Sequence, residues 1–302
     1  MKIAILGADG LLGHELVEHF TARSEHVVMP LQLDDLDITD RDASKKVLLA
    51  IHPEVVINAA VLVSVEKCEA DPEQAYAVNR DGVQNLLEAS LILKTPPLFI
   101  QISSSEVFGR WNEGEYVVRG YQEDDEPKPM SVYQKSKAEA EAIITSFANE
   151  HPEVLRNWYI VRASWFFGAG RETFVEQFVR ALQGRDELVV AEDQWRCPTW
   201  TRDFSEALDA LMSKPEPNGM YHIANDVRPG EATVMDVIEE IRLFLDIPKS
   251  DVRMRRVKLH DFFKTPRAPS NVLLNTKLPK LRPWREALRE YLTLRYPART
   301  RS

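Results

Sequence analysis

The sequence predicts an α/β fold in which a doubly wound parallel sheet is joined to a smaller C-terminal domain. Short runs rich in apolar and β-branched residues alternate with longer segments of helical periodicity through the first half of the chain. This alternation is typical of βαβ units. The first run leads directly into a glycine-rich turn, and beyond about Ser164 the regular alternation loosens. A second, differently built unit is therefore expected after that point.

The expected strands are nearly continuous hydrophobic runs, as a parallel sheet covered on both faces requires. Helices are expected between them because apolar residues recur there at spacings of three and four, and the pair Asp71 and Pro72 is a typical helix start. The strands are Lys2–Leu6, His26–Met29, Val55–Ala59, Leu98–Ile102 and Trp158–Arg162, and the helices are Leu11–Arg23, Ala43–Ile51, Pro72–Leu93 and Tyr133–Asn149.

The second half offers shorter elements, and the stretch from Ile247 to Pro283 offers few. We expect residues 1–164, with 199–224, to form the first domain, and residues 165–302 to form a second domain interleaved with it. The expected elements here are the helices Thr173–Gln183, Asp203–Ser213 and Thr233–Leu245 and the strands Leu188–Val190 and Tyr221–Ile223.

Composition excludes several classes of partner. The chain has 302 residues, and 38 basic against 47 acidic residues give a net charge of −9, which repels nucleic-acid phosphates and acidic membranes. The longest nearly apolar stretch, Val55–Val63, is too short to span a bilayer. Cys68 and Cys197 provide neither a disulfide framework nor a zinc site, and the seven histidines form no metal motif. We expect a cytoplasmic protein with no metal.

The glycine turn follows the first strand as Gly7-Ala8-Asp9-Gly10-Leu11-Leu12-Gly13. Glycines at these positions permit a tight turn and a close approach of the backbone to a pyrophosphate held at the helix N-terminus. The alternative is a plain strand–turn–helix with incidental glycines. The spacing resembles that of the short-chain dehydrogenase/reductase superfamily, extended branch, and so implies a Rossmann-type domain. The expected cofactor contacts are Gly7, Gly10, Leu11, Leu12 and Gly13.

Further cofactor contacts follow from the position of the strands and from this resemblance. At the end of the second strand stand Gln32 and Leu33, neither acidic nor basic, so the choice between NADP and NAD stays open. The resemblance implies that Asp37 and Ile38 contact the adenine side, although an aspartate there can equally be a helix cap. Small residues after the third strand let a cofactor lie against the sheet edge. These are Asn58, Ala59 and Ala60, and the resemblance adds Asn79.

The candidate catalytic residues are Ser104, Tyr133 and Lys137. Ser104 ends the fourth strand, and the spacing of Tyr133 and Lys137 puts a phenol and an ammonium on one helix face. A free phenol has a pKa of roughly 10, and a nearby cation lowers it toward working pH. The phenol can then exchange a proton with a carbonyl or alcohol oxygen. Tyr133 and Lys137 are also expected cofactor contacts. The alternative is a surface helix with a tyrosine and scattered lysines.

Several stretches resemble dTDP-4-dehydrorhamnose reductases along nearly the whole chain. The resemblance implies that Ser104, Tyr133 and Lys137 are catalytic and that Trp165 lies by the sugar. It also places Arg267 and Asn271 near the substrate's nucleotide end or at the closure of the second domain. The stretches include Val56–Ala60, Glu66–Glu69, Ala75–Asn79, Val161–Trp165, Tyr221–Ala224 and Arg267–Asn271.

The chain departs from that family beside the catalytic serine. Where those reductases typically read Ser-Thr-Asp-Tyr-Val-Phe, this chain reads Ser-Ser-Ser-Glu-Val-Phe over 103–108. Ser105 and Glu106 thus replace an acid and a phenol near the sugar, and Val63 replaces an expected polar residue. Glu106 also resembles the glutamate that acts as a base in nucleotide-sugar dehydratases and decarboxylases. A polar residue at the rim of the site is the other interpretation.

The expected activity is reduction of the 4-keto group of a nucleotide-linked deoxysugar with NADP or NAD as cofactor. One alternative is an epimerase, dehydratase or decarboxylase that uses Glu106 as base. Another is a non-catalytic regulatory subunit of the same fold. The resemblance also implies a homodimer. The loop from Phe108 to Tyr133, with the acidic run Glu123–Glu126, is either a solvated loop or a lid over the sugar.

Overall fold

A six-stranded parallel sheet forms the centre of the computed structural model, which describes residues 1–109, 119–214 and 216–297. The strand order is β2-β1-β3-β4-β5-β9, and all neighbours are parallel. The chain moves outward from β1 to β2 and then returns past β1 to β3, so the switch point of this sheet lies beside β1. The strands are β1 (Lys2–Leu6), β2 (Val27–Leu31), β3 (Val55–Asn58), β4 (Leu98–Ser104), β5 (Trp158–Ala163) and β9 (Gly219–His222).

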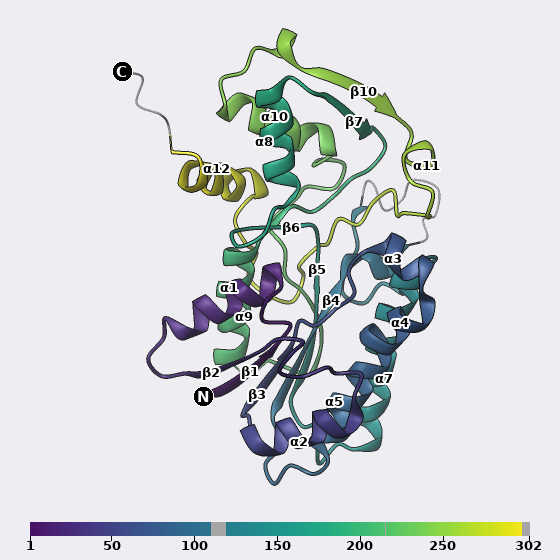
Figure 1. Ribbon diagram of the computed structural model, residues 1–302, viewed down its shortest axis with the longest axis vertical. Helices are drawn as coiled ribbons and strands as arrows, with labels where there is room; N and C mark the ends of the chain where they lie inside the picture. Colours follow the sequence, from purple (N-terminus) through teal and green to yellow (C-terminus); the bar gives the residue numbers. More distant parts are fainter. Residues whose placement is uncertain (110–118, 215, 298–302) are drawn as a thin grey trace.

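Helices cover both faces of the sheet, as the hydrophobic strands predict (Figure 1). On one face, buried residues of α2 (Arg41–Ile51), α5 (Gly82–Ser90) and α7 (Val132–Glu150) pack into one cluster with alternate strand residues. On the other face, α1 (Leu11–Thr21) and α9 (Thr201–Ser213) do the same. The doubly wound arrangement expected from the sequence is confirmed.

The expected single helix Pro72–Leu93 is wrong, because this segment is broken. It contains α4 (Pro72–Tyr76), a π-helical turn over Ala77–Asp81, and α5, which ends at Ser90. A separate short helix, α3 (Val65–Ala70), precedes it. Asp71 does cap α4, as its carboxylate accepts a hydrogen bond from the Gln74 amide at 3.0 Å.

Several strand ends also differ from the expected ones. β4 continues to Ser104, two residues beyond the expected end at Ile102, and β2 runs to Leu31 instead of Met29. Pairing with β5 explains the first difference, because Ser104 is still in register with Ala163. The strand therefore carries the serine to the very edge of the sheet.

The C-terminal part of the chain packs around a hydrophobic cluster that also includes Val107, Phe108 and Tyr121. The elements of the C-terminal part lie above the sheet in Figure 1. Two short parallel pairs support it: β7 (Glu187–Ala191) with β10 (Arg253–Val257), and β6 (Phe166–Phe167) with β8 (Thr199–Trp200). The expected boundary near residue 164 stays a prediction. The remaining elements are α8 (Phe174–Gly184), α10 (Val234–Phe244), α11 (Leu259–Phe262), α12 (Trp284–Arg295) and the 3-10 turns η2 (Ser105–Phe108) and η3 (Lys249–Asp251).

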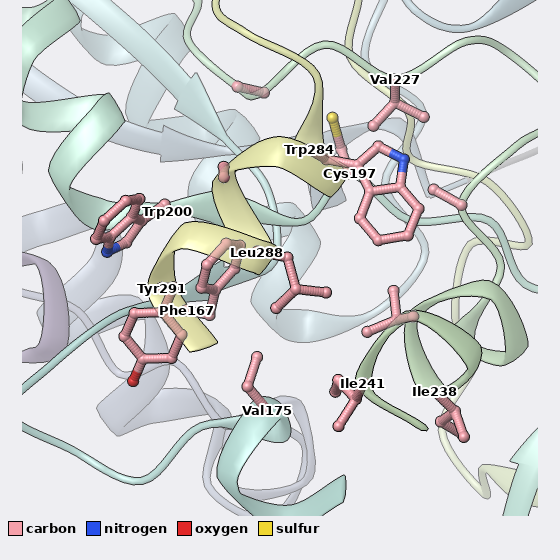
Figure 2. Close-up of a cluster of buried hydrophobic side chains, with 14 of the residues drawn as sticks. Phe167, Val175, Cys197, Trp200, Val227, Ile238, Ile241, Trp284, Leu288 and Tyr291 are labelled. Atoms are coloured by element: carbon pink, nitrogen blue, oxygen red, sulfur yellow. The ribbon is translucent and has the colours of Figure 1, made fainter. Parts of the chain in front are cut away.

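The sequence patterns missed α12 and β10. α12 reads Trp-Arg-Glu-Ala-Leu-Arg-Glu-Tyr-Leu-Thr-Leu-Arg, so charged residues interrupt a narrow apolar stripe. Trp284, Leu288 and Tyr291 of this stripe point into the cluster shown in Figure 2. β10 reads Arg-Met-Arg-Arg-Val and is mostly exposed, which hides its strand character.

Among the ranges described, no helix is both long enough and apolar enough to cross a bilayer.

Leu288→Ala tests the packing of α12. Leu288 is 0% exposed, whereas Leu294 on the same helix is 60% exposed. We expect Leu288→Ala to lower the free energy of unfolding by about 2–5 kcal/mol, because it removes buried methyl groups and leaves a cavity. The control Leu294→Ala should change it by less than about 0.5 kcal/mol. Urea unfolding measures both values, and equal losses would contradict the packing described.

Candidate active site

The glycine turn stands at the carboxyl end of β1, next to the switch point of the sheet. Gly7 has φ +71°, and the Gly10 amide donates to its carbonyl at 2.9 Å. A Cβ on Gly13 would lie 2.0 Å from the Gly7 oxygen, and one on Gly7 would lie 2.8 Å from the Ala60 Cα. The N-cap residue of α1 is Gly10, and no side chain caps this helix. The first backbone amides of α1 are therefore open to an anion. The turn thus fits a dinucleotide pyrophosphate, beside the expected contacts Leu11 and Leu12.

The side chains of Asn58 and Asn79 are buried, and each forms hydrogen bonds with backbone groups of the segment after β3. The Asn58 amide donates to Gln101 Oε1 at 2.9 Å, and its oxygen accepts from the Ala60 amide at 3.2 Å. Asn79 accepts from the Leu62 amide at 2.8 Å and donates to the Leu62 carbonyl at 3.1 Å. Both asparagines therefore shape the segment after β3 that passes Ala59 and Ala60. Their contact with a cofactor stays a prediction.

Asp37 makes local contacts in the structure. Its Oδ1 accepts from the Thr39 amide at 2.9 Å and from the Thr39 hydroxyl at 2.8 Å. The cap of α2 is instead Asp40, which accepts from the amides of Asp42 and Ala43. Ile38 is buried, and a Cβ on Gly82 would lie 2.6 Å from its Cδ1. Of the expected adenine-side pair, only Asp37 is exposed.

Ser104, Tyr133 and Lys137 meet at the carboxyl edge of the sheet. β4 delivers Ser104, and the first two turns of α7 deliver the other two, which are 6% and 2% exposed. The Ser104 side chain lies near enough to the Tyr133 phenol to oppose the rise of its pKa, and the Ser104 hydroxyl accepts from the Glu106 amide at 3.1 Å. Lys137 Nζ donates to the Ile102 carbonyl at 2.8 Å. The predicted catalytic set is thus brought together at one place.

The expected lowering of the Tyr133 pKa is wrong. Burial raises the pKa of Tyr133 to about 12, and the Glu106 carboxylate adds to this rise, while the Ser104 hydrogen bond opposes it. Burial likewise lowers the pKa of Lys137 to about 8, and the Glu141 carboxylate opposes that shift. Removal from water disfavours the charged form of each group more than neighbouring charges stabilise it.

A buried ion pair lies one turn beyond Lys137. Glu141 Oε1 accepts from Arg162 Nε at 2.9 Å, and Oε2 accepts from Arg162 Nη2 at 2.7 Å. The Ser103 hydroxyl donates to the same carboxylate at 2.6 Å. This pair ties α7 to β5 and β4. No local pattern indicates this pair, because Arg162 and Ser103 lie 21 and 38 residues from Glu141 along the chain.

Glu106 is held by three donors. Its carboxylate accepts from Arg196 Nη1 at 2.7 Å, Asn271 Nδ2 at 2.9 Å and Gln134 Nε2 at 2.9 Å. Burial alone would raise the pKa of this carboxyl, but Arg196, the Gln134 amide and Arg267 outweigh burial and hold the pKa below its usual range. A carboxylate so engaged is a poor general base. Sequence analysis missed Arg196 and Gln134 as its partners.

The other expected substrate contacts lie around this cluster. Ser105 is buried in η2. Trp165 has φ +38°, and its ring stacks on Phe174 at 3.8 Å between centroids. Arg267 pairs with Glu66 of α3 and lies over the Phe263 ring at 4.8 Å. Arg267 therefore ties the C-terminal part to the first helix after β3, and Trp165 packs within the C-terminal cluster. Their contact with a sugar stays a prediction.

The acidic run before the catalytic helix is not simply solvated. Glu123 is 1% exposed, and its carboxylate accepts from the Thr276 amide at 3.0 Å. The solvated interpretation is therefore wrong for Glu123. Residues 110–118 of the expected lid lie outside the described residues. Both cysteines are free and buried, and the described ranges hold no group of His, Cys, Asp or Glu able to bind a metal.

A serine, a tyrosine and a lysine beside a glycine turn at the carboxyl edge of a parallel sheet define a nicotinamide-dependent reductase of the short-chain type. The chain belongs to the family described as RmlD substrate binding domain, whose model matches residues 1–296. It is 30% identical to the spore coat polysaccharide biosynthesis protein SpsK of Bacillus subtilis, over 98% of this chain and 99% of that protein. It is 32% identical to a dTDP-4-dehydrorhamnose reductase of Aggregatibacter actinomycetemcomitans, over 74% of each.

Solved structures agree with this assignment. A dTDP-4-dehydrorhamnose reductase of Clostridium acetobutylicum superposes with a TM-score of 0.84 at 31% identity, over 97% of this chain and 99% of that chain. A dTDP-4-dehydrorhamnose reductase of Bacillus anthracis, solved in complex with NADP, has the same fold, with a TM-score of 0.84 at 24% identity and coverage of 97% and 99%.

Gly13→Ala tests the glycine turn as the dinucleotide site. The new Cβ would overlap the Gly7 oxygen, so we expect the turn to shift and the Kd for NADH or NADPH to rise at least about tenfold, a loss of about 1.4 kcal/mol. Gly184→Ala is the control, because there the new Cβ meets only the end of the Asp186 side chain at 3.1 Å. Fluorescence titration measures both, and an unchanged Kd in Gly13→Ala would contradict the assignment.

Lys137→Met tests the buried ammonium. The pKa of Lys137 falls from 10.5 to about 8 on folding, so between these pH values the unfolded chain binds more protons and stability rises with pH. The methionine variant has no ammonium to titrate and lacks this increase. The free energy of unfolding of the wild-type protein should therefore rise by roughly 3 kcal/mol relative to that of the variant as pH increases through that window. Urea unfolding at several pH values measures the difference, which should stay flat for the exposed control Lys135→Met.

Proposed function

We propose that the chain reduces the 4-keto group of a nucleotide-linked deoxysugar, using NADPH or NADH. The observation that carries the proposal is the convergence of Ser104, Tyr133 and Lys137 beside the glycine turn. Several relatives are named dTDP-4-dehydrorhamnose reductases, and dTDP-4-dehydrorhamnose is accordingly the substrate to test first.

The residues present fit the cofactor that this reaction needs. The backbone around Gly7, Gly10 and Gly13 would hold the pyrophosphate, and Lys137 would hold the nicotinamide ribose. When bound, the reduced nicotinamide supplies the hydride. The protein's own part is to place the sugar carbonyl and to supply a proton.

Tyr133 supplies that proton to the oxygen of the reduced carbonyl. Its raised pKa keeps the phenol protonated at neutral pH, as a proton donor requires. Lys137, with a pKa of about 8, is charged at neutral pH and stabilises the tyrosinate that remains after transfer. Ser104, whose side chain acts on the phenol, is placed to donate to the same substrate oxygen. The three residues thus act on one oxygen.

No observation favours the alternatives over reduction. Glu106 is engaged by Arg196, Asn271 and Gln134, which argues against its use as the base of an epimerase or dehydratase. A regulatory subunit would have no need of an assembled catalytic set. The proposal includes a nucleotide-sugar ligand, a cytoplasmic location in keeping with two free thiols, and a homodimer as the resemblance implies.

Tyr133→Phe tests the proposed function. With dTDP-4-dehydrorhamnose and NADPH or NADH, we expect the loss of reduced-nicotinamide absorbance to slow by about 10²–10⁴-fold, because the proton donor is gone. The Kd for the dinucleotide should stay within about twofold, since the glycine turn is intact. Tyr296→Phe, beyond the end of α12, is the matched control. Full activity in Tyr133→Phe, or no turnover by wild-type protein, would contradict the proposal.

A further inference from the structure

We propose that Glu106 is a positioning residue that connects the C-terminal part of the chain to the N-terminal cap of the catalytic helix α7. The inference rests on the proposed reductase function. It assigns Glu106 and its neighbour Gln134 a role in holding Tyr133, in place of the role as a base that the sequence left open. The connection consists of buried hydrogen bonds that run from one part of the protein to the other.

On the side of the helix, the connection passes through Gln134. Its Nε2 donates to Glu106 Oε2 at 2.9 Å, while its Oε1 accepts from the amides of Met130 at 2.8 Å and Ser131 at 3.2 Å. Gln134 is also the third helical residue of a capping box with Ser131. Glu106 can only accept, so it fixes which end of the amide faces the cap. Tyr133 stands directly before this glutamine.

Gly109 provides the room for this arrangement. A Cβ on Gly109 would lie 2.0 Å from Gln134 Oε1 and 2.7 Å from its Cδ. Gly109 has φ −58°, so the backbone itself does not require glycine there. The missing side chain of Gly109 leaves space for the side-chain amide of Gln134, which is 0% exposed. This amide is therefore held both by hydrogen bonds and by close packing against Gly109.

On the side of the C-terminal part, side chains from two segments donate hydrogen bonds to Glu106. Arg196 donates from the stretch between β7 and β8, and Asn271 donates from the stretch after α11. The backbone amide of Asn271 donates to the Trp195 carbonyl at 3.3 Å, and the backbone amide of Arg196 donates to the Ala232 carbonyl at 2.9 Å. A movement of these segments would therefore pull on Glu106, then on Gln134 and the cap of α7.

The charge of Glu106 gives the connection an electrostatic readout. The groups that act on the Tyr133 phenol are Ser104 from β4, Glu106 from η2, Cys68 from α3 and Arg267 from the C-terminal part. Lys137 stands one turn further along the same helix. Glu106 raises the pKa of the phenol, so loss of its charge should lower that pKa. A residue that only filled space would not produce this change.

The test compares Glu106→Gln with Glu106→Asp, with Glu139→Gln as control. Glu139 is an exposed carboxylate of α7 that pairs with Arg80 at 3.1 Å. For Glu106→Gln we expect kcat to fall about 10–100-fold, since small misplacements at a reaction centre have effects of this size. Tyrosinate absorbance of the folded protein should appear at lower pH than in wild type, because the Glu106 charge that raises the Tyr133 pKa is gone. The first-turn amides of α7 should exchange hydrogen faster. Glu106→Asp should restore the tyrosinate titration in part.

Gly109→Ala separates geometry from charge. It displaces the Gln134 amide but leaves the carboxylate in place, so kcat should fall and exchange in the first turn should rise. The tyrosinate titration should move less than in Glu106→Gln. Because exchange and tyrosinate absorbance are measured on the folded protein without substrate, a variant of lower stability still gives a result below its melting temperature.

Two outcomes would overturn the inference. One is a folded Glu106→Gln protein with wild-type kcat, tyrosinate titration and exchange. The other is incorporation of solvent deuterium into the carbon skeleton of the sugar by wild-type protein and its loss in Glu106→Gln, which would make Glu106 a base. Failure of the proposed function is a separate result: wild-type protein would not oxidise the dinucleotide, while the exchange and tyrosinate measurements would still decide the role of Glu106.

Discussion

The active site depends on the buried ion pair between Arg162 of β5 and Glu141 of α7. Arg162 is 0% exposed and Glu141 is 2% exposed, so neither charge can be left without its partner. Removing one member of such a pair typically costs about 3–5 kcal/mol. Together with the bond from Ser103 of β4, the pair fixes the helix against two strands at once. Lys137, one turn earlier, then meets the Ile102 carbonyl, and the tyrosine before it meets the catalytic serine.

The burial that fixes these side chains also decides their protonation. Tyr133 and Lys137 have ordinary pKa values only half a unit apart, at 10.0 and 10.5, but in the folded chain these move apart to about 12 and about 8. The order of the two groups is therefore reversed, and the proton is retained by the phenol. A phenol that keeps its proton holds the proton that the proposed reduction consumes. General acid catalysis is most efficient when the pKa lies near the working pH, so in the proposed reaction the charge of Lys137 must stabilise the tyrosinate during the transfer.

Sequence patterns predicted the features that are local and missed those that depend on distant contacts. β1 has the expected bounds, and the serine, tyrosine and lysine meet as their spacing indicated. The π-turn in the segment after Pro72 was missed because Asn79 bonds Leu62, seventeen residues away. The partners of Glu106 could not be found either, since Arg196 and Asn271 lie 90 and 165 residues from it in the sequence. The raised pKa of Tyr133 follows from burial, which no local pattern displays.

The charge of Glu106 explains why the C-terminal part and α7 are coupled in this chain. A neutral phenol at this position could be buried with one hydrogen bond, whereas a carboxylate in a low-dielectric site must be paired and fully bonded. Among the described residues, α7 supplies the Gln134 amide, whereas the positive charges near Glu106 are those of Arg196, which pairs with it, and Arg267, both from the C-terminal part. Moving the C-terminal part away would leave the Glu106 carboxylate without its partners Arg196 and Asn271. The position of the C-terminal part and the N-terminal cap of α7 are therefore energetically coupled through Glu106. In the proposed role, one carboxylate beside Ser104 thereby links the C-terminal part of the chain to the N-terminal cap of α7.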